Sequence, residues 1–458
     1  MTRLISWRAR LIPANGYSIP SVYLHRLNSN RRHYSKMPSL THDCGIDAEP
    51  LYRYEPGGYH PVELGDILKD GRYKVLHKLG WSSFSTTWAA KDQENNSYVA
   101  VKVKVSEAKD TREFDVLEAI SALPKHHPGS SHANQMLDHF TLGGPNGSHE
   151  CLVLELVGPS VSDAIEFYCN IHRLPAKVAK SFAKQALRGL DFLVANDIAH
   201  GAVPDLKSLN VEDFMAALGK LQAGPVTKKG GGPLGNHVPT QIVRPATFRG
   251  LDHILYRSSI KIIDFGEDFL RNNVSNTLNT PLVMRAPEAI FGDRLDRRVD
   301  LWSAGCLVVT NQQFWIFELI TGQPAFEVLP KNHAQLGQQM IEETGDEFPS
   351  RWQAKWNAMQ KYVSHDDERF TLQEWMEATY FFHDGKDEFT KEELAKICET
   401  IICMLKFEPS LRATPSEILA QGSYLEVLLE TTQIRSEVAA HSRRQWFVKH
   451  NSGGSKTV

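Results

Sequence analysis

Residues 262–266 read Ile-Ile-Asp-Phe-Gly, a short apolar run that ends in an acidic residue shortly before a glycine. The run is typical of a buried strand, and the glycine marks the point where the strand ends. Asp264 is therefore expected at the end of a strand. Taken alone the stretch decides little, because its meaning depends on the order of the motifs on either side.

Four other motifs accompany this stretch, and each is weak when it is taken by itself. A lysine on a strand is usually a surface residue, and an Asp five residues before an Asn in a loop is usually a turn. In chain order the motifs are Val-Ala-Val-Lys at 99–102, Asp-Leu-Lys-Ser-Leu-Asn at 205–210, Ala-Pro-Glu at 286–288 and Asp-Leu-Trp-Ser-Ala-Gly at 300–305.

The pattern between the motifs predicts an α+β fold with two lobes. Residues 73–80, 84–90 and 98–105 are rich in β-branched and aromatic residues and are joined by short polar turns, which predicts three antiparallel strands. A helix is expected over 107–121 and a buried strand over 151–157. From about residue 175 the apolar spacing becomes helical and stays so over most of the remainder.

In this order the motifs make the sequence resemble a eukaryotic protein kinase, and more narrowly the fungal relatives of the SR-protein kinases in the CMGC group. The resemblance covers roughly residues 43–425, and it implies a small antiparallel-sheet lobe with one helix and a larger, mainly helical lobe. The supporting stretches are 79–88, 264–269, 280–288 and 321–326.

The resemblance implies a Ser/Thr protein kinase that uses ATP and Mg²⁺, in which catalysis consists mostly of positioning and charge neutralisation. Lys102 would bridge the α- and β-phosphates, paired with Glu113, or in reserve Glu118, from the following helix. Asp205 would accept the proton of the substrate hydroxyl, and Lys207 would neutralise the γ-phosphate.

The same resemblance assigns the remaining binding residues. Asn210 and Asp264 would hold Mg²⁺, and the hinge from Glu155 to Val157 would bind adenine through its backbone, with Leu154 behind the pocket. Glu288 and Arg412 match an architectural buried ion pair. The glycine-rich loop over the phosphates corresponds to Leu79, Gly80, Trp81, Ser82, Ser83, Phe84 and Ser85.

The sequence departs from the family pattern in three places. Ser82 replaces the second glycine of the loop, where a Cβ would restrict positive φ and weaken ATP binding. Three extra residues at 202–204 separate the His200-Gly201 anchor from Asp205 and are expected to loosen the catalytic loop. Nine further residues at 307–315 interrupt an expected helix. Both insertions are either real and tolerated or the product of wrongly assigned exon boundaries.

Composition limits the alternatives. The 458 residues include 51 basic and 54 acidic residues, a net charge of −3 that argues against binding nucleic acid or a membrane surface with the whole chain. No apolar run reaches the ~18–20 residues of a membrane span. The scattered cysteines fit a reduced intracellular protein better than a disulfide framework or a zinc site. They are Cys44, Cys151, Cys169, Cys306, Cys398 and Cys403.

The expected organisation begins with residues 1–42, which contain no Asp or Glu and are either a mitochondrial transit peptide, a disordered basic extension or a false start upstream of Met37. A lead-in follows over 43–72. The N-lobe and hinge span 73–158, the C-lobe spans 159–426 with a surface insertion of linker composition at 219–248, and a tail ends the chain at 427–458. The expected location is the cytoplasm or nucleus, with the mitochondrion open.

Residues 341–400 hold 15 acidic and 7 basic residues, which are either a docking surface for Arg-rich substrates or a solvated helical face. The sequence thus predicts a monomeric Ser/Thr kinase for basic, Arg/Ser-rich proteins. The alternatives are a pseudokinase that acts as a scaffold and, more distantly, a small-molecule kinase.

Overall fold

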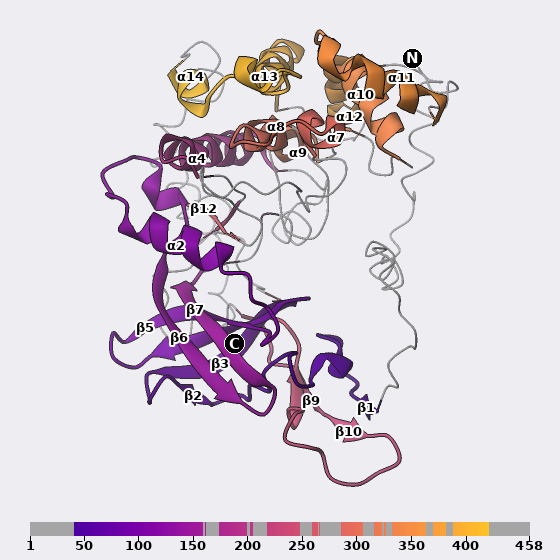
Figure 1. Cartoon of the computed structure of the whole chain (residues 1–458). Coiled ribbons are helices and arrows are strands. Elements are labelled where there is room, and N and C mark those ends of the chain that lie inside the picture. The colour runs from indigo at the N-terminus through magenta and orange to yellow at the C-terminus, as the bar shows by residue number, and fades with distance from the viewer. Residues whose placement is uncertain are drawn as a thin grey trace, which may run out of the picture.

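The computed structural model arranges the chain as a sheet lobe and a helical lobe, stacked one on the other in Figure 1. This is the predicted α+β architecture. The structure describes residues 41–158, 161, 174–198, 202–204, 218–247, 259–263, 265, 285–305, 316–322, 325–326, 332–362, 370–381 and 388–420.

The sheet lobe contains one six-stranded antiparallel sheet in the order β2-β3-β4-β5-β7-β6. The sequence predicts its hairpin-connected strands β3 to β5, and the strand expected over 151–157 overlaps β7, whereas β6 was not predicted. The bounds are β2 (Ile67–Leu68), β3 (Tyr73–Ser82), β4 (Ser85–Asp92), β5 (Ser97–Lys104), β6 (Met136–Gly144) and β7 (Gly147–Glu155).

Helix α2 (Arg112–Ala122) follows β5 and begins five residues later than the sequence predicts. The reason is local, because the N–H of Ala108 donates to Val105 O (3.1 Å) and the chain turns there before it enters the helix. The buried face of α2 carries Val116, Leu117 and Ile120, which pack into the same apolar cluster as the helices of the other lobe. The helix therefore connects the two lobes.

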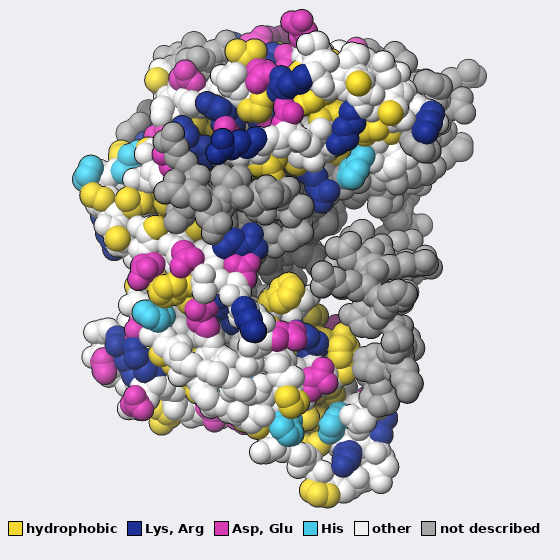
Figure 2. Space-filling view, viewed as in Figure 1, with side chains coloured by type: hydrophobic (Ala, Val, Ile, Leu, Met, Phe, Trp, Pro, Cys, Tyr) yellow, Lys and Arg dark blue, Asp and Glu magenta, His cyan; other side chains and the backbone are white. Residues whose placement is uncertain are grey.

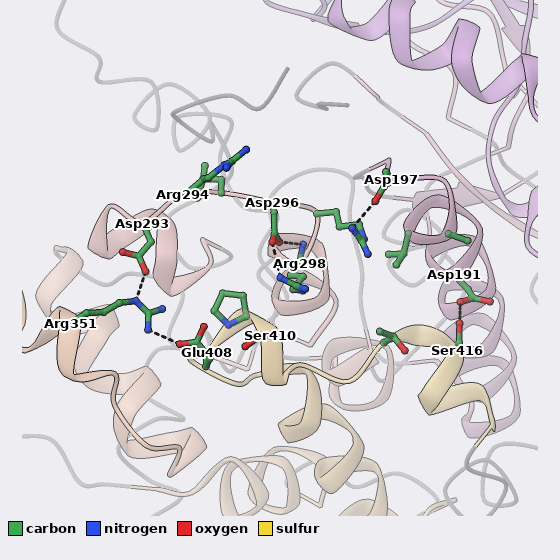
Figure 3. Close-up of a pocket in the computed structure, with 16 residues that line it drawn as sticks. Asp191, Asp197, Asp293, Arg294, Asp296, Arg298, Arg351, Glu408, Ser410 and Ser416 are labelled. Atoms are coloured by element: carbon green, nitrogen blue, oxygen red, sulfur yellow. Dashed lines mark hydrogen bonds and ion pairs between the residues drawn. The ribbon is translucent and has the colours of Figure 1, made fainter. Parts of the chain in front are cut away.

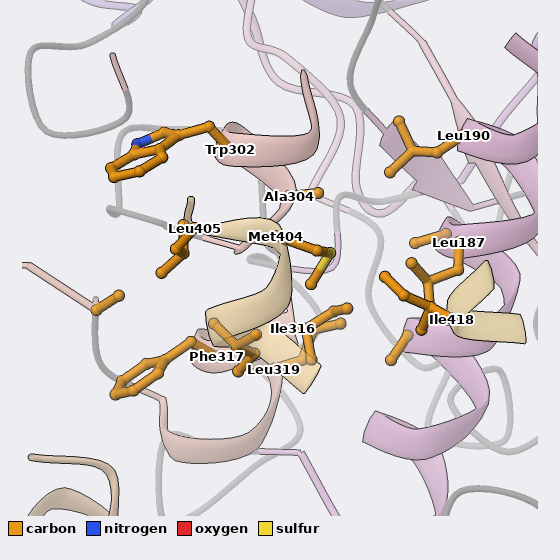
Figure 4. Packing of buried hydrophobic residues seen from close by; sticks show 14 of the residues in the cluster. Leu187, Leu190, Trp302, Ala304, Ile316, Phe317, Leu319, Met404, Leu405 and Ile418 are labelled. Atoms are coloured by element: carbon orange, nitrogen blue, oxygen red, sulfur yellow. The ribbon is translucent and has the colours of Figure 1, made fainter. Parts of the chain in front are cut away.

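The helical lobe is built around α4 (Ala176–Ala195), as the spacing of apolar residues predicts. Figure 4 shows the centre of its core, where Leu187 and Leu190 of α4 lie near Ile418, and Ile316 and Met404 come from two further helices. The other elements are α7 (Pro287–Phe291), α8 (Val299–Gly305), α9 (Ile316–Thr321), α10 (His333–Thr344), α11 (Gln353–Met359), α12 (Leu372–Tyr380), α13 (Lys391–Met404) and α14 (Pro415–Ala420), with 3₁₀ turns η3 (Leu51–Arg53), η4 (Ser130–His132), η7 (Ser350–Trp352), η8 (Gln360–Tyr362) and η9 (Pro409–Leu411).

Helices α8 and α9 flank the predicted insertion at 307–315, which lies outside the described residues. Trp302 of α8 and Phe317 of α9 are both fully buried in the same core. The two helices therefore share one apolar core on either side of the insertion.

The segment at 219–248 is not only a surface linker, and this part of the prediction is wrong. It forms β9 (Ala223–Pro225), β10 (Thr227–Lys228) and β11 (Gln241–Val243); β9 pairs with β11, and β10 pairs with β1 (His42–Asp43). Val226 and Ile242 are buried in one cluster with Tyr54 and Tyr59 of the lead-in. Figure 1 shows this hairpin beside β1 at the far end of the sheet lobe.

The lead-in is attached to the sheet by a buried ion pair between Glu49 and Lys78 of β3, with side chains 0% and 1% exposed. Tyr54 Oη donates to the same Glu49 oxygen (2.5 Å), and the Lys78 ammonium lies 4.6 Å from the centre of the Trp88 ring. Burial lowers the pKa of Lys78, and the charge of Glu49 opposes that effect.

Contacts near β12 (Ile260–Ile262) join the lobes. The N–H of Asn134 donates to Ile262 O (2.8 Å), and Lys261 Nζ donates to Glu155 Oε2 (2.7 Å) at the end of β7. Both side chains of this ion pair are largely buried. No helix in the described part of the chain is long and apolar enough to cross a membrane.

The predicted contact between Glu288 and Arg412 is confirmed. The guanidinium donates to both carboxylate oxygens (2.7 and 2.6 Å), and both side chains are at most 1% exposed. Arg412 also donates to the carbonyls of Lys406 and Arg298, and it lies 5.3 Å from the centre of the Trp302 ring. Removing one partner leaves an uncompensated buried charge.

We expect Arg412→Met to lower the free energy of unfolding by about 3–5 kcal/mol, because it leaves the Glu288 carboxylate buried without its partner. Arg297→Met is the matched control, since Arg297 and Asp197 are each more than a third exposed, and it should cost less than about 1 kcal/mol. Urea denaturation of both variants measures the difference. Equal losses would contradict the architectural role of the pair.

Candidate active site

One face of the central strands is lined by small and polar side chains. Along β5, Val99, Val101 and Val103 pack into the core of the sheet lobe. Because side chains alternate along a strand, Ala100 and Lys102 lie on the opposite face. We call the face of β3 to β5 that carries Lys102 the cleft face.

A row of three residues crosses the cleft face at Lys102. In the register of the sheet Gly80 of β3 pairs with Thr87 of β4, which pairs with Lys102 of β5. Neighbours in such a row share a face of the sheet. A Cβ at Gly80 would meet no atom within 4 Å, so the sheet face is open at Gly80, two strands away from Lys102. This open space and the ammonium lie on one face of the sheet, which fits a ligand that carries phosphates.

Lys102 forms an ion pair with α2. Its Nζ lies 2.5 Å from Glu113 Oε1, and the two side chains are 16% and 8% exposed. Glu118, the other carboxylate considered from sequence, is exposed. The structure thus brings together two of the predicted site residues, Lys102 and Glu113, from a strand and a helix.

An apolar surface adjoins this pair on the cleft face. Ala89 and Ala100 are neighbours in the register and are 0% and 5% exposed. They belong to one cluster with Leu156, at 2% exposure, and with Leu218, at 0%, which lies directly before the inserted segment at 219–248. Two alanine side chains are small enough to leave room for the face of a planar base. In this structure, however, the buried Leu218 belongs to the same cluster and packs with them.

The predicted hinge residues are partly used by the fold itself. The N–H of Glu155 donates to Gln135 O (3.0 Å), and its carboxylate pairs with Lys261. The Glu155 N–H is therefore bound within the fold, and adenine binding by the rest of the backbone from Glu155 to Val157 stays a prediction. Val157 lies two residues further on and is partly exposed.

The predicted glycine-rich loop is the hairpin between β3 and β4. Ser82 pairs with Ser85, so the Ser82 backbone is extended, and Ser82 is not among the described residues with positive φ. The expected conflict between its Cβ and a left-handed conformation does not arise here. Leu79 packs against the apolar cluster of the cleft face, and the exposed tip residues are Trp81, Ser82, Ser83 and Phe84.

Four predicted catalytic and metal-binding residues, Asp205, Lys207, Asn210 and Asp264, lie outside the described residues. Within the described residues no group of three or more His, Cys, Asp and Glu side chains could hold a metal ion. The inserted residues 202–204 form strand β8 (Ala202–Pro204), which pairs with β12. Strand pairing constrains the backbone of these three residues. His200, Gly201 and Asp205 lie outside the described residues, so the expected loosening of the catalytic loop stays a prediction.

Several acidic residues of the 341–400 region have structural roles. Glu374 and Glu393 complete capping boxes with Thr371 and Thr390 at the starts of α12 and α13. Asp346 accepts from Lys406 Nζ (3.0 Å). Figure 2 shows basic and acidic side chains interspersed on the face in view. Helix capping and an ion pair thus account for part of the acidic excess, and the choice between a docking surface and a solvated face stays open.

A cavity of about 1020 Å³ lies in the helical lobe, between the end of α4, residues 293–298 and the start of α14 (Figure 3). Its charged side chains are largely paired with one another. Arg351 donates to Asp293 (2.6 Å) and Glu408 (2.5 Å), and Arg297 donates to Asp197 (2.6 Å). No predicted site residue lines it, so it is separate from the cleft at Lys102.

We expect Leu218→Ala to strengthen adenosine binding about 3- to 10-fold, because a base that packs on Ala89 and Ala100 must first displace the buried leucine. Leu221→Ala, which shortens an exposed leucine of the same segment, should leave the affinity unchanged. Calorimetric titration of both variants measures the effect. Weaker adenosine binding by Leu218→Ala would instead make Leu218 a wall of the base pocket.

No family model matches the chain. A Ser/Thr protein kinase of Aspergillus fumigatus is 30% identical over 276 residues, 60% of this chain, and the match spans 66% of that relative's length. The Ser/Thr-protein kinase SRPK of Physarum polycephalum is 28% identical over 80% of this chain and 88% of its own length. Human SRSF protein kinase 3 is 38% identical over 31% of this chain and 25% of its own length.

Among solved structures, the crystal structure of the kinase domain PF14_0431 matches 80% of this chain and 98% of that domain, with a TM-score of 0.52 and 21% identity. This likeness shows the fold, and the named relatives are all protein kinases. The two-lobed fold, the Lys102–Glu113 pair and these relatives agree with the resemblance seen in the sequence. The chain belongs to the Ser/Thr protein kinases, and the relatives to which it is similar include kinases named SRPK and SRSF protein kinase 3.

Proposed function

We propose that this chain transfers the γ-phosphate of ATP to Ser or Thr hydroxyls of Arg/Ser-rich proteins. The observation that carries the proposal is the Lys102–Glu113 ion pair on the same face of the sheet as the open space at Gly80. An ammonium that a carboxylate holds in place is pre-positioned for a phosphate, so little ordering is left for the moment of binding.

The proposed site divides the nucleotide between two parts of the cleft face. Lys102 would hold the α- and β-phosphates, and Ala89 and Ala100 would pack on the base. The hairpin tip from Trp81 to Ser85 would cover the phosphates. ATP supplies the phosphoryl group, and Mg²⁺ held by Asn210 and Asp264 would offset its charge.

In the proposed reaction the substrate oxygen forms a bond to the γ-phosphorus while the bond to the bridging oxygen of ADP breaks. Asp205 would accept the hydroxyl proton, and Lys207 would offset charge on the transferring group. A pseudokinase with the same fold would bind partners without this transfer.

The Arg/Ser preference rests on the SRPK and SRSF kinase names of two relatives and on the acidic excess of residues 341–400. Glu347, Glu392 and Glu399 are exposed, so their carboxylates can contact guanidinium groups. We propose that the protein acts in the cytoplasm or nucleus as a monomer. The mitochondrial interpretation of residues 1–42 gains no support from the relatives, and residues 1–40 lie outside the described part.

We expect the chain to transfer phosphate from labelled Mg-ATP to an Arg-Ser repeat peptide at a rate at least ~10-fold higher than to a Lys-Ser repeat of equal charge. The reason is that only Arg binds carboxylates through two parallel hydrogen bonds. Asp264→Ala is the blank, and circular dichroism is used to check that this variant is folded. Transfer no greater than this blank would leave the pseudokinase interpretation. Equal rates on both peptides would contradict the Arg-specific part of the proposal.

A further inference from the structure

The hairpin tip between β3 and β4 is held from its outer side by the lead-in. Tyr59 Oη donates to the carbonyl of Ser82 (2.7 Å), and Arg53 Nη2 donates to the carbonyl of Ser83 (3.1 Å). Arg53 is itself fixed by Glu107 (2.8 Å) and lies 5.6 Å from the centre of the Tyr59 ring. Two consecutive carbonyls of the tip therefore have side-chain partners from residues 53–59.

Tyr59 is well suited to this contact. Its side chain is 1% exposed and packs in one cluster with Val105, Val226 and Ile242. Burial raises the pKa of Tyr59 to about 12, so the hydroxyl stays protonated and can donate at physiological pH. The N–H of Val105 binds the next carbonyl, that of Phe84 (2.8 Å), so three successive carbonyls are held by this cluster and by Arg53.

The opposite side of the tip belongs to the cleft face. Ser85 lies two residues before Thr87, and so on the face that carries Lys102. Ser82 is the cross-strand partner of Ser85, and their hydroxyl oxygens are 3.1 Å apart. The two serine side chains therefore lie on the cleft face.

The geometry of the peptide bond means that the hydrogen bonds to the tip carbonyls also fix the directions of the tip N–H groups. In a trans peptide the C=O of one residue and the N–H of the next point in opposite directions, and the described chain contains no cis peptide. Holding the carbonyls of Ser82 and Ser83 outward therefore directs the N–H groups of Ser83 and Phe84 toward the cleft. The N–H of Phe84 indeed donates to Ser82 Oγ (3.3 Å), on the cleft side.

We propose that Tyr59 and Arg53 are positioning residues that orient the tip N–H groups of Ser83 and Phe84 toward the phosphates of the nucleotide. This inference rests on the proposed function. Successive backbone N–H groups on one side of a turn bind anions. A loop that carries Ser82 in place of a glycine has fewer backbone conformations to choose from, and the two outer hydrogen bonds select one that serves phosphate binding.

The test compares the binding of Mg-ATP with that of adenosine, because adenosine lacks phosphates and does not use the tip. Tyr59→Phe removes only the donated hydrogen bond and keeps the buried ring. We expect it to weaken Mg-ATP binding about 3- to 10-fold and to change adenosine binding less than about twofold, with Arg53→Ala acting in the same direction. Isothermal titration calorimetry of the full chain measures both ligands.

Tyr54→Phe is the matched control. Tyr54 is also buried and lies against the Tyr59 ring at 5.5 Å between centres, but its hydroxyl donates to Glu49 and not to the tip. It should leave the ratio of Mg-ATP to adenosine affinity unchanged even if it lowers the melting temperature.

Three results would overturn the inference. In Tyr59→Phe, either no change or an equal loss for Mg-ATP and adenosine would show that the residue is only structural. A shift of the ratio in Tyr54→Phe as large as in Tyr59→Phe would assign the effect to packing. If the unsubstituted chain binds neither ligand, the proposed function itself fails, and that result is distinct from the outcomes for the two tyrosine variants.

Discussion

The ion pair between Lys102 and Glu113 is the contact on which the geometry of the cleft depends. It joins the central strand β5 to α2, and α2 in turn packs its apolar face into the core of the helical lobe. A charge that is largely withdrawn from water needs its partner, so each residue fixes the position of the other. The position of α2 therefore determines where the ammonium stands relative to the space at Gly80.

A second set of contacts holds the sheet lobe from the side away from the cleft. The lead-in is attached by the buried Glu49–Lys78 pair, and the segment at 219–247 is attached through β1 and β10. Together they support the hairpin tip through Tyr59 and reach the cleft face through Leu218. These two segments thus contact both the hairpin tip, where we propose that the phosphates bind, and the alanines on which we propose that the base packs.

The sequence was informative where a pattern is local. Alternation over residues 98–105 predicts β5 and the face on which Lys102 lies, and helical spacing predicts α4. The choice of Glu113 over Glu118 followed from the resemblance, whereas their burial could not be read from the residues alone. Strand β6 and the roles of Tyr59 and Arg53 were missed, because their partners lie far away in the chain and no local pattern encodes them.

The inserted segment shows the same limit in another form. Its Gly- and Lys-rich stretch has the composition of a linker, yet its Lys228 pairs with His42, which comes far earlier in the sequence. Composition indicates how flexible an isolated segment would be, but it contains no information about a partner strand that comes from a distant part of the chain. The prediction that the Cβ of Ser82 would conflict with a positive φ was wrong for a related reason, because the observed backbone at Ser82 is extended.

The most direct measurement is the rate of phosphate transfer by Glu113→Gln compared with Glu118→Gln, two changes on the same helix that differ in whether Lys102 loses its partner. Because Glu118 is exposed, we predict a loss of about 100-fold in kcat/KM for the first and less than about twofold for the second. Full activity in Glu113→Gln, or equal losses in both folded variants, would contradict the central place of the ion pair.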